Sequence, residues 1–235
     1  MSPSTRWLAR CEEHLPAGLD WLTSADAERV AAMRFPKRRT EFLVARWTAR
    51  QAGRLILGVP DLEVRRHPSG APEAYAEGRP LEVGISLTHR AGWAVCLLGL
   101  EPGAVGCDLE LVEPRSAAFV ADYFTPAERA FIGEDPLRAN LIWSAKESAL
   151  KVLRAGLRRD TRSVEVTAGP ESDGWSPLNV RAVEGRGFPG WWRRCGDFVL
   201  TSCAVRRTAP PEAPADPICS VGGVFCACGG TVDRR

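Results

Sequence analysis

The sequence predicts an α+β protein made of two similar halves. The main observation is that a long helical stretch followed by strand-like runs occurs twice along the chain. The length of 235 residues is enough for two packed units with full cores. A linker-like composition, rich in proline and alanine, follows Val205. We therefore expect an N-terminal half over residues 1–104, a C-terminal half over residues 105–207 and a disordered tail over residues 208–235.

Composition argues against several classes of function. The formal net charge is only +2, so no strong basic field indicates a nucleic-acid partner. No apolar run reaches the length of a membrane helix, and the polar N-terminal end carries no apolar stretch. The eight cysteines are scattered, which does not suggest a disulfide framework in a chain of this size. We expect a cytoplasmic protein without membrane contacts.

Two helices are predicted in the N-terminal half. Thr23 or Ser24 can cap a short helix that runs to about Met33. Pro36 then stands at the first position of a longer helix that Gly58 ends. This longer helix has one apolar face and one basic face, and the basic face could meet phosphate groups. The basic face consists of Lys37, Arg38, Arg39, Arg46 and Arg50.

Two pairing strands and then an acidic strand follow. Residues 83–89 and 92–100 are expected to pair around a turn. After Gly103, apolar residues alternate along an extended segment, so their side chains point one way into a core. Asp108 and Glu110 are then left together on the opposite face, two residues apart. The apolar set is Val105, Cys107, Leu109 and Leu111.

The C-terminal half is predicted to begin with helices and to continue with strands. Residues 125–128 read as a helix-capping box with proline at the first helical position, a role that needs no catalytic chemistry. Asp135 and Pro136 start the next helix, which Gly156 is placed to end. Strand-like runs follow at residues 163–168, 177–184, 190–195 and 197–205.

The second long helix adds a third carboxylate and an ammonium group. Glu147 and Lys151 are four residues apart, so they share one face of the helix. Together with Asp108 and Glu110 they suggest a metal-dependent phosphoryl-transfer site. Mg²⁺ suits these oxygen ligands, whereas the three histidines are far apart in sequence. The buried stripe of this helix consists of Leu141, Ala145, Ala149 and Val152.

Three sequence blocks carry a resemblance to a known family. The first is the Gly-x-Asp-x-Glu pattern of residues 106–110, and the second is the Trp-Ser-x-Lys-Glu-Ser-x-x-Lys pattern of residues 143–151. The third is Thr88-His89 after an apolar strand. Through these blocks, residues 30–207 resemble the Sfp-type 4′-phosphopantetheinyl transferases, which move the phosphopantetheine arm of coenzyme A onto a serine of a carrier protein.

The resemblance implies a fold, a reaction and partners. The fold would be a pseudo-symmetric, pseudo-dimeric pair of α+β halves with the active site in the cleft between them. Coenzyme A would be the co-substrate, Mg²⁺ would bind its pyrophosphate, and 3′,5′-ADP would be released. The partners would be acyl or peptidyl carrier proteins of fatty-acid, polyketide or nonribosomal-peptide assembly, and the chain is expected to be a monomer.

The resemblance also implies roles for individual residues. Asp108, Glu110 and Glu147 would hold the metal, and Glu147 could be a metal ligand, the base for the serine proton, or both. Lys151 would meet the phosphate and the departing oxygen as an ammonium, and His89 is expected at the 3′-phosphate. The catalytic residues are then Glu147 and Lys151. The coenzyme A-binding set is Arg38, Arg39, Arg46, Thr88, His89, Arg90 and Lys151.

One position departs from the family pattern. The family often has a basic residue between glycine and proline ahead of the histidine block, whereas this chain has Ala71 between Gly70 and Pro72. A cationic contact to coenzyme A is therefore missing at Ala71, and other basic residues would have to bind the phosphates.

Other interpretations of the same residues remain open. Glu147 and Lys151 could be a surface ion pair worth about 0.3 kcal/mol, and Asp108 with Glu110 could be a solvated strand face. A metal-dependent nucleotide phosphohydrolase would also use clustered carboxylates, but it does not account for the block that begins at Trp143. Outside catalysis, the alternative is an inactive module of the same fold that binds coenzyme A or a carrier protein.

Overall fold

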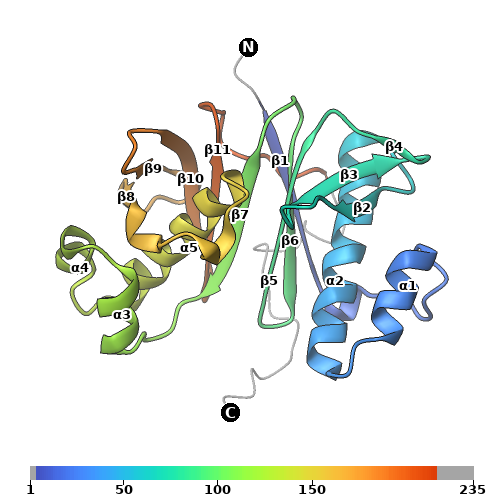
Figure 1. Cartoon of the computed structure of the whole chain (residues 1–235), viewed down its shortest axis with the longest axis horizontal. Helices are drawn as coiled ribbons and strands as arrows, with labels where there is room; N and C mark the ends of the chain where they lie inside the picture. Colours follow the sequence, from blue (N-terminus) through green and yellow to red (C-terminus); the bar gives the residue numbers. More distant parts are fainter. Residues whose placement is uncertain (1–3, 216–235) are drawn as a thin grey trace.

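The computed structural model describes residues 4–215, and in this part of the chain three antiparallel sheets are found. Two larger sheets stand side by side, and a long helix packs on each (Figure 1). Helix α2 (Pro36–Ala52) covers the first sheet and α5 (Pro136–Val152) covers the second. Strands β5 (Gly84–Arg90) and β7 (Val105–Leu111) are neighbours where the two halves meet.

The N-terminal half has the predicted helices and strand pair. Thr23 caps the first helix, and Pro36 is the first residue of α2. Gly58, in the left-handed conformation at φ 69°, follows the π-helical turn that extends α2. Ala91 and Gly92 both have positive φ and form the tight turn after β5. In chain order this half contains β1 (Thr5–Cys11), a 3₁₀ turn (Glu12–His14), α1 (Ser24–Ala31), α2, the π-helical turn (Gly53–Leu57), β2 (Glu63–Arg66), β3 (Pro72–Ala76), β4 (Arg79–Pro80), β5 and β6 (Trp93–Gly99).

Strand β1 is absent from the predictions because Arg6 and Arg10 make its residues look polar. In the structure all seven residues of β1 pair with β6, in a sheet of order β1-β6-β5. Arg10 is only 2% exposed, so its charged side chain lies inside the fold and not in water. The small sheet β2-β3-β4 was also not predicted, because its strands are short and rich in polar residues.

Part of the expected disordered tail runs along β1. The backbone N–H of Trp7 donates to the carbonyl of Glu212, and the N–H of Glu212 donates to the carbonyl of Thr5, both at 3.0 Å. Glu212 is thus placed against the N-terminal half, whereas the carbonyl of Thr208 accepts a hydrogen bond from Trp191 Nε1 of the C-terminal half at 3.2 Å. The disorder expected for this segment stays a prediction. The remainder of the expected tail, residues 216–235, lies outside the described residues.

The C-terminal half contains the predicted acidic strand, helices and four strands. Its sheet has the order β7-β11-β10-β9-β8 with antiparallel neighbours. Thr125 and Glu128 form the predicted capping box at the start of α4. In chain order the elements are β7, α3 (Ala117–Tyr123), α4 (Pro126–Ile132), α5, two 3₁₀ turns (Gly156–Arg158 and Thr161–Ser163), β8 (Val164–Ala168), β9 (Ser176–Ala182), β10 (Gly187–Cys195) and β11 (Phe198–Ala204).

Helix α5 ends at Val152, before the predicted stop at Gly156. Arg154 adopts the left-handed conformation at φ 55°, and the N–H of Ala155 donates to the carbonyl of Leu150 at 3.1 Å. This bonding pattern closes the C-terminal end of a helix, where glycine is the usual residue. The sequence predicted the wrong stop because an arginine takes the position that glycine normally occupies.

The mixture of helices and antiparallel sheets agrees with the predicted α+β class. Each half carries one helix of 17 residues with proline at its first position, packed on a sheet. A pseudo-symmetric relation between the halves stays a prediction.

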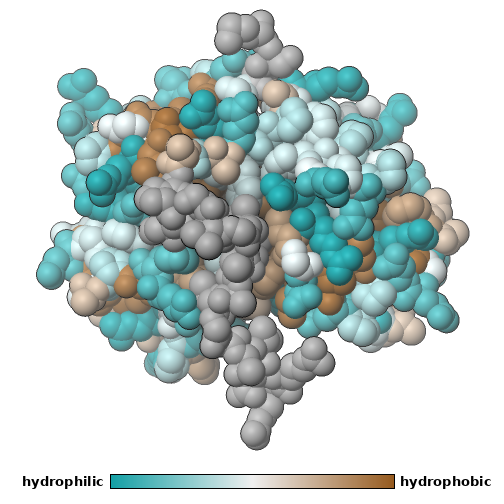
Figure 2. All heavy atoms as spheres, turned by 180° about the vertical axis from the view of Figure 1, so that it is seen from behind, coloured by the Kyte–Doolittle hydropathy of each residue, from teal (hydrophilic) through white to brown (hydrophobic). Residues whose placement is uncertain are grey.

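The surface mixes polar and apolar residues. Over the visible part of the back face, hydrophilic and hydrophobic residues are interspersed (Figure 2). No helix in residues 4–215 combines the length and the apolar character that crossing a membrane requires. The exposed large apolar residues in this part of the chain are Leu19, Phe35, Leu55, Tyr123, Phe131 and Val183.

Helix α5 approaches strand β7 closely at Gly106. A Cβ atom at Gly106 would lie 2.0 Å from the carbonyl oxygen of Ser148, which is far closer than two such atoms can come. The close approach lets Lys151 Nζ on the helix donate to the carbonyl of Cys107 on the strand at 2.8 Å. The glycine of the Gly-x-Asp-x-Glu block is therefore required by packing.

We predict that Gly106→Ala lowers the free energy of unfolding by about 1–3 kcal/mol, because the added methyl group overpacks the contact between helix and strand. Urea unfolding followed by tryptophan fluorescence measures the change. Gly187→Ala is the matched control, since a Cβ there meets its nearest neighbour at an ordinary 3.7 Å. Equal midpoints for Gly106→Ala and the wild-type protein would contradict the packing role.

Candidate active site

Asp108 stands on the face of β7 opposite its apolar residues, as the alternation of the strand predicted, and α5 covers this face. Its Oδ1 accepts hydrogen bonds from Thr88 Oγ1 at 3.0 Å and from Lys151 Nζ at 2.9 Å. The residue is 6% exposed, and its second oxygen, Oδ2, is buried without a hydrogen-bond partner in the described part of the chain. One carboxylate thus connects β5, β7 and α5.

Glu147 and Lys151 come from the same face of α5, as predicted. Glu147 Oε1 is buried and has no hydrogen-bond partner among the described residues. Burial, and then the negative charge of Asp108, raise the pKa of Glu147 to about 7, although Lys151 acts in the opposite direction. Burial would lower the pKa of Lys151, but the negative charge of Asp108 beside it helps to give a net increase. The ammonium therefore stays charged next to a carboxyl group that titrates near neutrality.

Glu110 lies on the same face of β7 and has partners on both oxygens. Trp143 Nε1 donates to Oε1 at 3.0 Å, and Arg115 Nη2 donates to Oε2 at 2.9 Å. Arg90 Nε lies 3.6 Å from Oε2. Burial and the charge of Asp108 raise the pKa of Glu110, while the two arginines lower it, with a net increase.

These donors fit a hard divalent cation. The two unpartnered oxygens, Asp108 Oδ2 and Glu147 Oε1, are buried, and a buried carboxylate oxygen is costly unless a proton or a cation meets it. Within residues 4–215, no three histidine, cysteine or acidic side chains are already gathered closely enough to hold a metal ion. Mg²⁺ commonly takes only one or two protein carboxylates and completes its shell with water and substrate phosphates. Asp108 and Glu147, with Glu110 beside them, meet that requirement.

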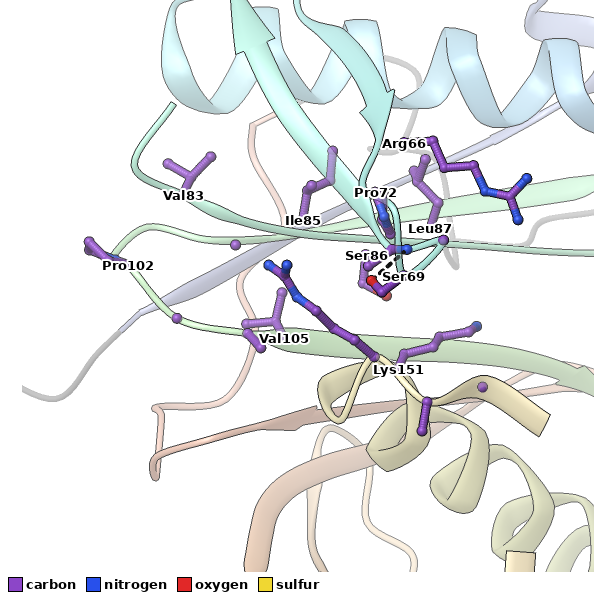
Figure 3. A pocket seen from close by; sticks show the side chains of 18 of the residues that line it. Arg66, Ser69, Pro72, Val83, Ile85, Ser86, Leu87, Pro102, Val105 and Lys151 are labelled. Carbon is purple, nitrogen blue, oxygen red and sulfur yellow. Dashed lines mark hydrogen bonds between the residues drawn. The ribbon is translucent and has the colours of Figure 1, made fainter. Parts of the chain in front are cut away.

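A cavity of about 830 Å³ lies between the halves and reaches Lys151. Figure 3 shows Ile85 and Leu87 of β5 on one side of it, with Val105 and Lys151 on the facing side. The loop of residues 69–72 contributes to the lining. Ala71, the residue that differs from the family pattern, therefore borders this cavity. Its size is typical of a site for a small molecule or a cofactor.

The cavity is cationic as well as apolar. Among the described residues that line the cavity, one is acidic, Glu82, and four are cationic. Arg158 Nη2 donates to the carbonyl of Ser69 at 3.0 Å, which joins the two halves across the cavity. The surroundings suit an anionic ligand that also has an apolar or aromatic part. The cationic lining residues are Arg66, Lys151, Arg154 and Arg158.

The predicted coenzyme A residues are brought together only in part. Lys151 lines the cavity, and Thr88 lies beside it through their shared partner Asp108. Arg90 makes an ion pair with Glu113 at the C-terminal end of β5. These residues border the carboxylates, on the side where the two halves meet.

The other predicted coenzyme A-binding residues, which are Arg38, Arg39, Arg46 and His89, do not line the cavity. Arg46 is paired with Asp26 at 2.9 Å and its guanidinium lies over the ring of Phe42. Arg38 and Arg39 are exposed in the first turns of α2. In addition, His89 Nδ1 faces Glu41 on α2 at a distance of 3.9 Å.

Sequence reasoning missed several residues of the site. Arg66, Arg154 and Arg158 reach the cavity from segments whose proximity no sequence spacing reveals. Arg115 was not singled out, although it follows the acidic strand by only a few residues. Trp143 belongs to a quoted block, but its bond to Glu110 could not be inferred without the fold.

Lys146, next to Glu147 in the sequence, is not part of the site. It is fully buried, and its Nζ forms an ion pair with Glu128 at 2.8 Å. The same Nζ donates to the carbonyls of Thr161 and Val164, both at 2.8 Å. Burial lowers its pKa, and the pair with Glu128 counteracts this effect. Lys146 therefore fastens α5 to α4 and β8.

Comparison with protein families gives a match within the C-terminal half. Residues 104–200 match the model of the 4′-phosphopantetheinyl transferase superfamily. The matched segment contains the acidic strand and the whole of α5, with Asp108, Glu147 and Lys151. A search of curated proteins gave no match to this chain.

We predict that ionisation of Glu147 destabilises the metal-free protein. The pKa of Glu147 in the folded chain is about 7, above the ordinary value of 4.5. The contribution of the neutral carboxyl group to the free energy of unfolding is therefore complete below about pH 4.5, and it is lost as the pH rises through 7. Glu147→Gln stays neutral. In EDTA its melting temperature should therefore exceed that of the wild-type protein at pH 8, by roughly 2–4 °C for each kcal/mol, and this excess should shrink towards pH 5.

Thermal unfolding across this pH range, followed by fluorescence, measures the difference. Glu134→Gln, at an exposed position, is the matched control and should follow the wild-type protein at every pH. A constant difference between Glu147→Gln and the wild-type protein from pH 5 to 8 would show that the Glu147 carboxyl does not titrate in this range.

Proposed function

We propose that this protein is an Sfp-type 4′-phosphopantetheinyl transferase that uses coenzyme A and Mg²⁺ to modify a serine of acyl or peptidyl carrier proteins. The observation that most supports this function is the pair of buried, unpartnered oxygens on Asp108 and Glu147 beside the ammonium of Lys151. Lys151 lines a cationic cavity, and all three residues lie in the segment that matches the superfamily model.

The cavity is the proposed place for the nucleotide part of coenzyme A. Apolar side chains such as Ile85 and Val105 would pack on the base, and the arginines would meet its phosphate groups. Arg66 and Arg158 line the cavity together with the loop that carries Ala71. They therefore offer a cationic replacement for the basic residue that the family often has at the position of Ala71.

In the proposed reaction, the hydroxyl oxygen of the carrier serine attacks the phosphorus atom that bears the pantetheine arm. A new bond forms between this oxygen and phosphorus, and the bond from the same phosphorus to the bridging pyrophosphate oxygen breaks. The products are the phosphopantetheinyl carrier protein and 3′,5′-ADP, and the serine proton passes to a base. Negative charge grows on the bridging oxygen as it departs.

The chain offers a group for each task. Lys151, fixed by Asp108 and by the carbonyl of Cys107, would donate to phosphate oxygens as their charge grows. Glu147 would act as a metal ligand, as the base that accepts the serine proton, or as both. Asp108, Glu110 and Glu147 would hold Mg²⁺, which when bound neutralises charge on the pyrophosphate.

Two alternatives are less well supported. An inactive binding module of the same fold has no need for buried carboxylates with unpartnered oxygens, because these are costly to keep. A nucleotide phosphohydrolase would use the same carboxylates, but it does not explain the match over residues 104–200. As a transferase the chain would act on carrier proteins as a monomer.

We predict that the protein, with coenzyme A and Mg²⁺, adds one phosphopantetheine group to an unmodified acyl carrier protein, and that EDTA abolishes the addition. Asp108→Ala should lower the rate by about 10²–10³, because the metal and Lys151 both lose a partner. Intact-mass spectrometry of the carrier protein measures the product. Asp173→Ala, in an exposed loop, is the control and should retain full activity.

Three outcomes would contradict the proposal in different ways. If Asp108→Ala kept an activity near that of the wild-type protein, the assignment of Asp108 as a metal-binding residue would be wrong. No modification of several carrier types, with coenzyme A still bound, would favour the inactive module. Release of inorganic phosphate from nucleotides without carrier modification would favour the phosphohydrolase.

A further inference from the structure

The carboxylate of Glu110 is fixed mainly by one partly buried cation, Arg115. Trp143 and Arg115 donate to its two oxygens at 3.0 and 2.9 Å. Arg90 lies farther away, at 3.6 Å, and its side chain is 37% exposed, whereas that of Arg115 is 15% exposed. Arg115 therefore sets the orientation of Glu110 Oε2 more firmly than Arg90 does.

Arg115 is held in turn from its other side. Its Nε donates to Asn140 Oδ1 at 2.7 Å, and its guanidinium lies over the ring of Phe119 at 4.9 Å from the centroid. Asn140 is fully buried, and its Nδ2 donates to the carbonyls of Glu113 at 2.7 Å and Pro136 at 2.8 Å. A chain of partly buried hydrogen bonds thus runs from the first turn of α5 through Arg115 to a carboxylate on β7.

We infer that Arg115 is a positioning residue that holds the Glu110 carboxylate in its orientation towards a divalent cation, an inference that rests on the proposed function. The planar guanidinium donates to Asn140 through Nε and to Glu110 through Nη2 at the same time. A lysine ammonium is a compact charge on a flexible stem and cannot reproduce this geometry. Losing the partner that orients a metal-binding carboxylate typically changes metal affinity about 10–100-fold.

Arg115→Lys tests this role because the charge next to the site is unchanged. Mn²⁺ is the probe, and electron paramagnetic resonance measures the free ion during a titration of the full chain. We expect the dissociation constant for Mn²⁺ to rise about 10-fold. In carrier modification, the KM for Mg²⁺ should rise while the KM for coenzyme A stays unchanged. Arg138→Lys, at an exposed position on α5, is the control and should bind Mn²⁺ like the wild-type protein.

Asn140→Ala is the second variant, because it releases Arg115 from the other side without touching Glu110. It should also weaken Mn²⁺ binding. The double variant should lose less binding free energy for Mn²⁺ than the sum of the two single variants, because both substitutions act through one chain of hydrogen bonds.

Several results would overturn the positioning role of Arg115. One is a wild-type Mn²⁺ affinity in Arg115→Lys, or in Asn140→Ala if the first variant does not fold. Another is a lower melting temperature with no change in Mn²⁺ affinity, which is the signature of a purely structural residue. The Mn²⁺ titration needs no turnover, so a wild-type protein that binds Mn²⁺ but transfers nothing contradicts the proposed function alone. A wild-type protein that binds no Mn²⁺ contradicts both.

Discussion

The close packing of α5 on β7 is the contact on which the candidate site depends. Only a glycine at position 106 lets the helix backbone come near enough for Lys151 to reach both the carbonyl of Cys107 and the carboxylate of Asp108. The helix also brings Glu147 beside that carboxylate. The other face of β7 packs against apolar side chains of the N-terminal half. One pair of elements thus sets the positions of the carboxylates and of the ammonium group.

The balance of charge at this contact explains its chemical character. Asp108 and Glu110 are each bound by a cation, yet Asp108 Oδ2 and Glu147 Oε1 have no partner among residues 4–215. Excess negative charge in a poorly solvated place either takes up a proton or attracts a cation. The pKa of about 7 for Glu147 expresses the first response, and Mg²⁺ binding would be the second. The cationic cavity next to Lys151 extends the site towards an anionic ligand.

Sequence patterns predicted those parts that depend on local periodicity. Alternation placed Asp108 and Glu110 on one face of a strand, and helical spacing placed Glu147 with Lys151. Strand β1 was missed because a buried arginine, Arg10, contradicts the rule that charged residues lie outside. The resemblance implied a cleft between the halves, but the lining of the cavity could not be predicted, because it comes from segments between Arg66 and Arg158 that only the folded chain brings together. The α+β class followed from the order of elements, whereas the symmetry between the halves has only the family resemblance behind it.

The most direct test of this account is a crystal structure with coenzyme A and Mn²⁺, in which the anomalous signal of manganese marks the metal. We expect one manganese peak at the carboxylates of Asp108, Glu110 and Glu147, with the pyrophosphate beside Lys151 and the adenine nucleotide in the cavity lined by Arg66 and Arg158. A manganese peak away from these carboxylates, or a nucleotide bound outside the cavity, would contradict the account.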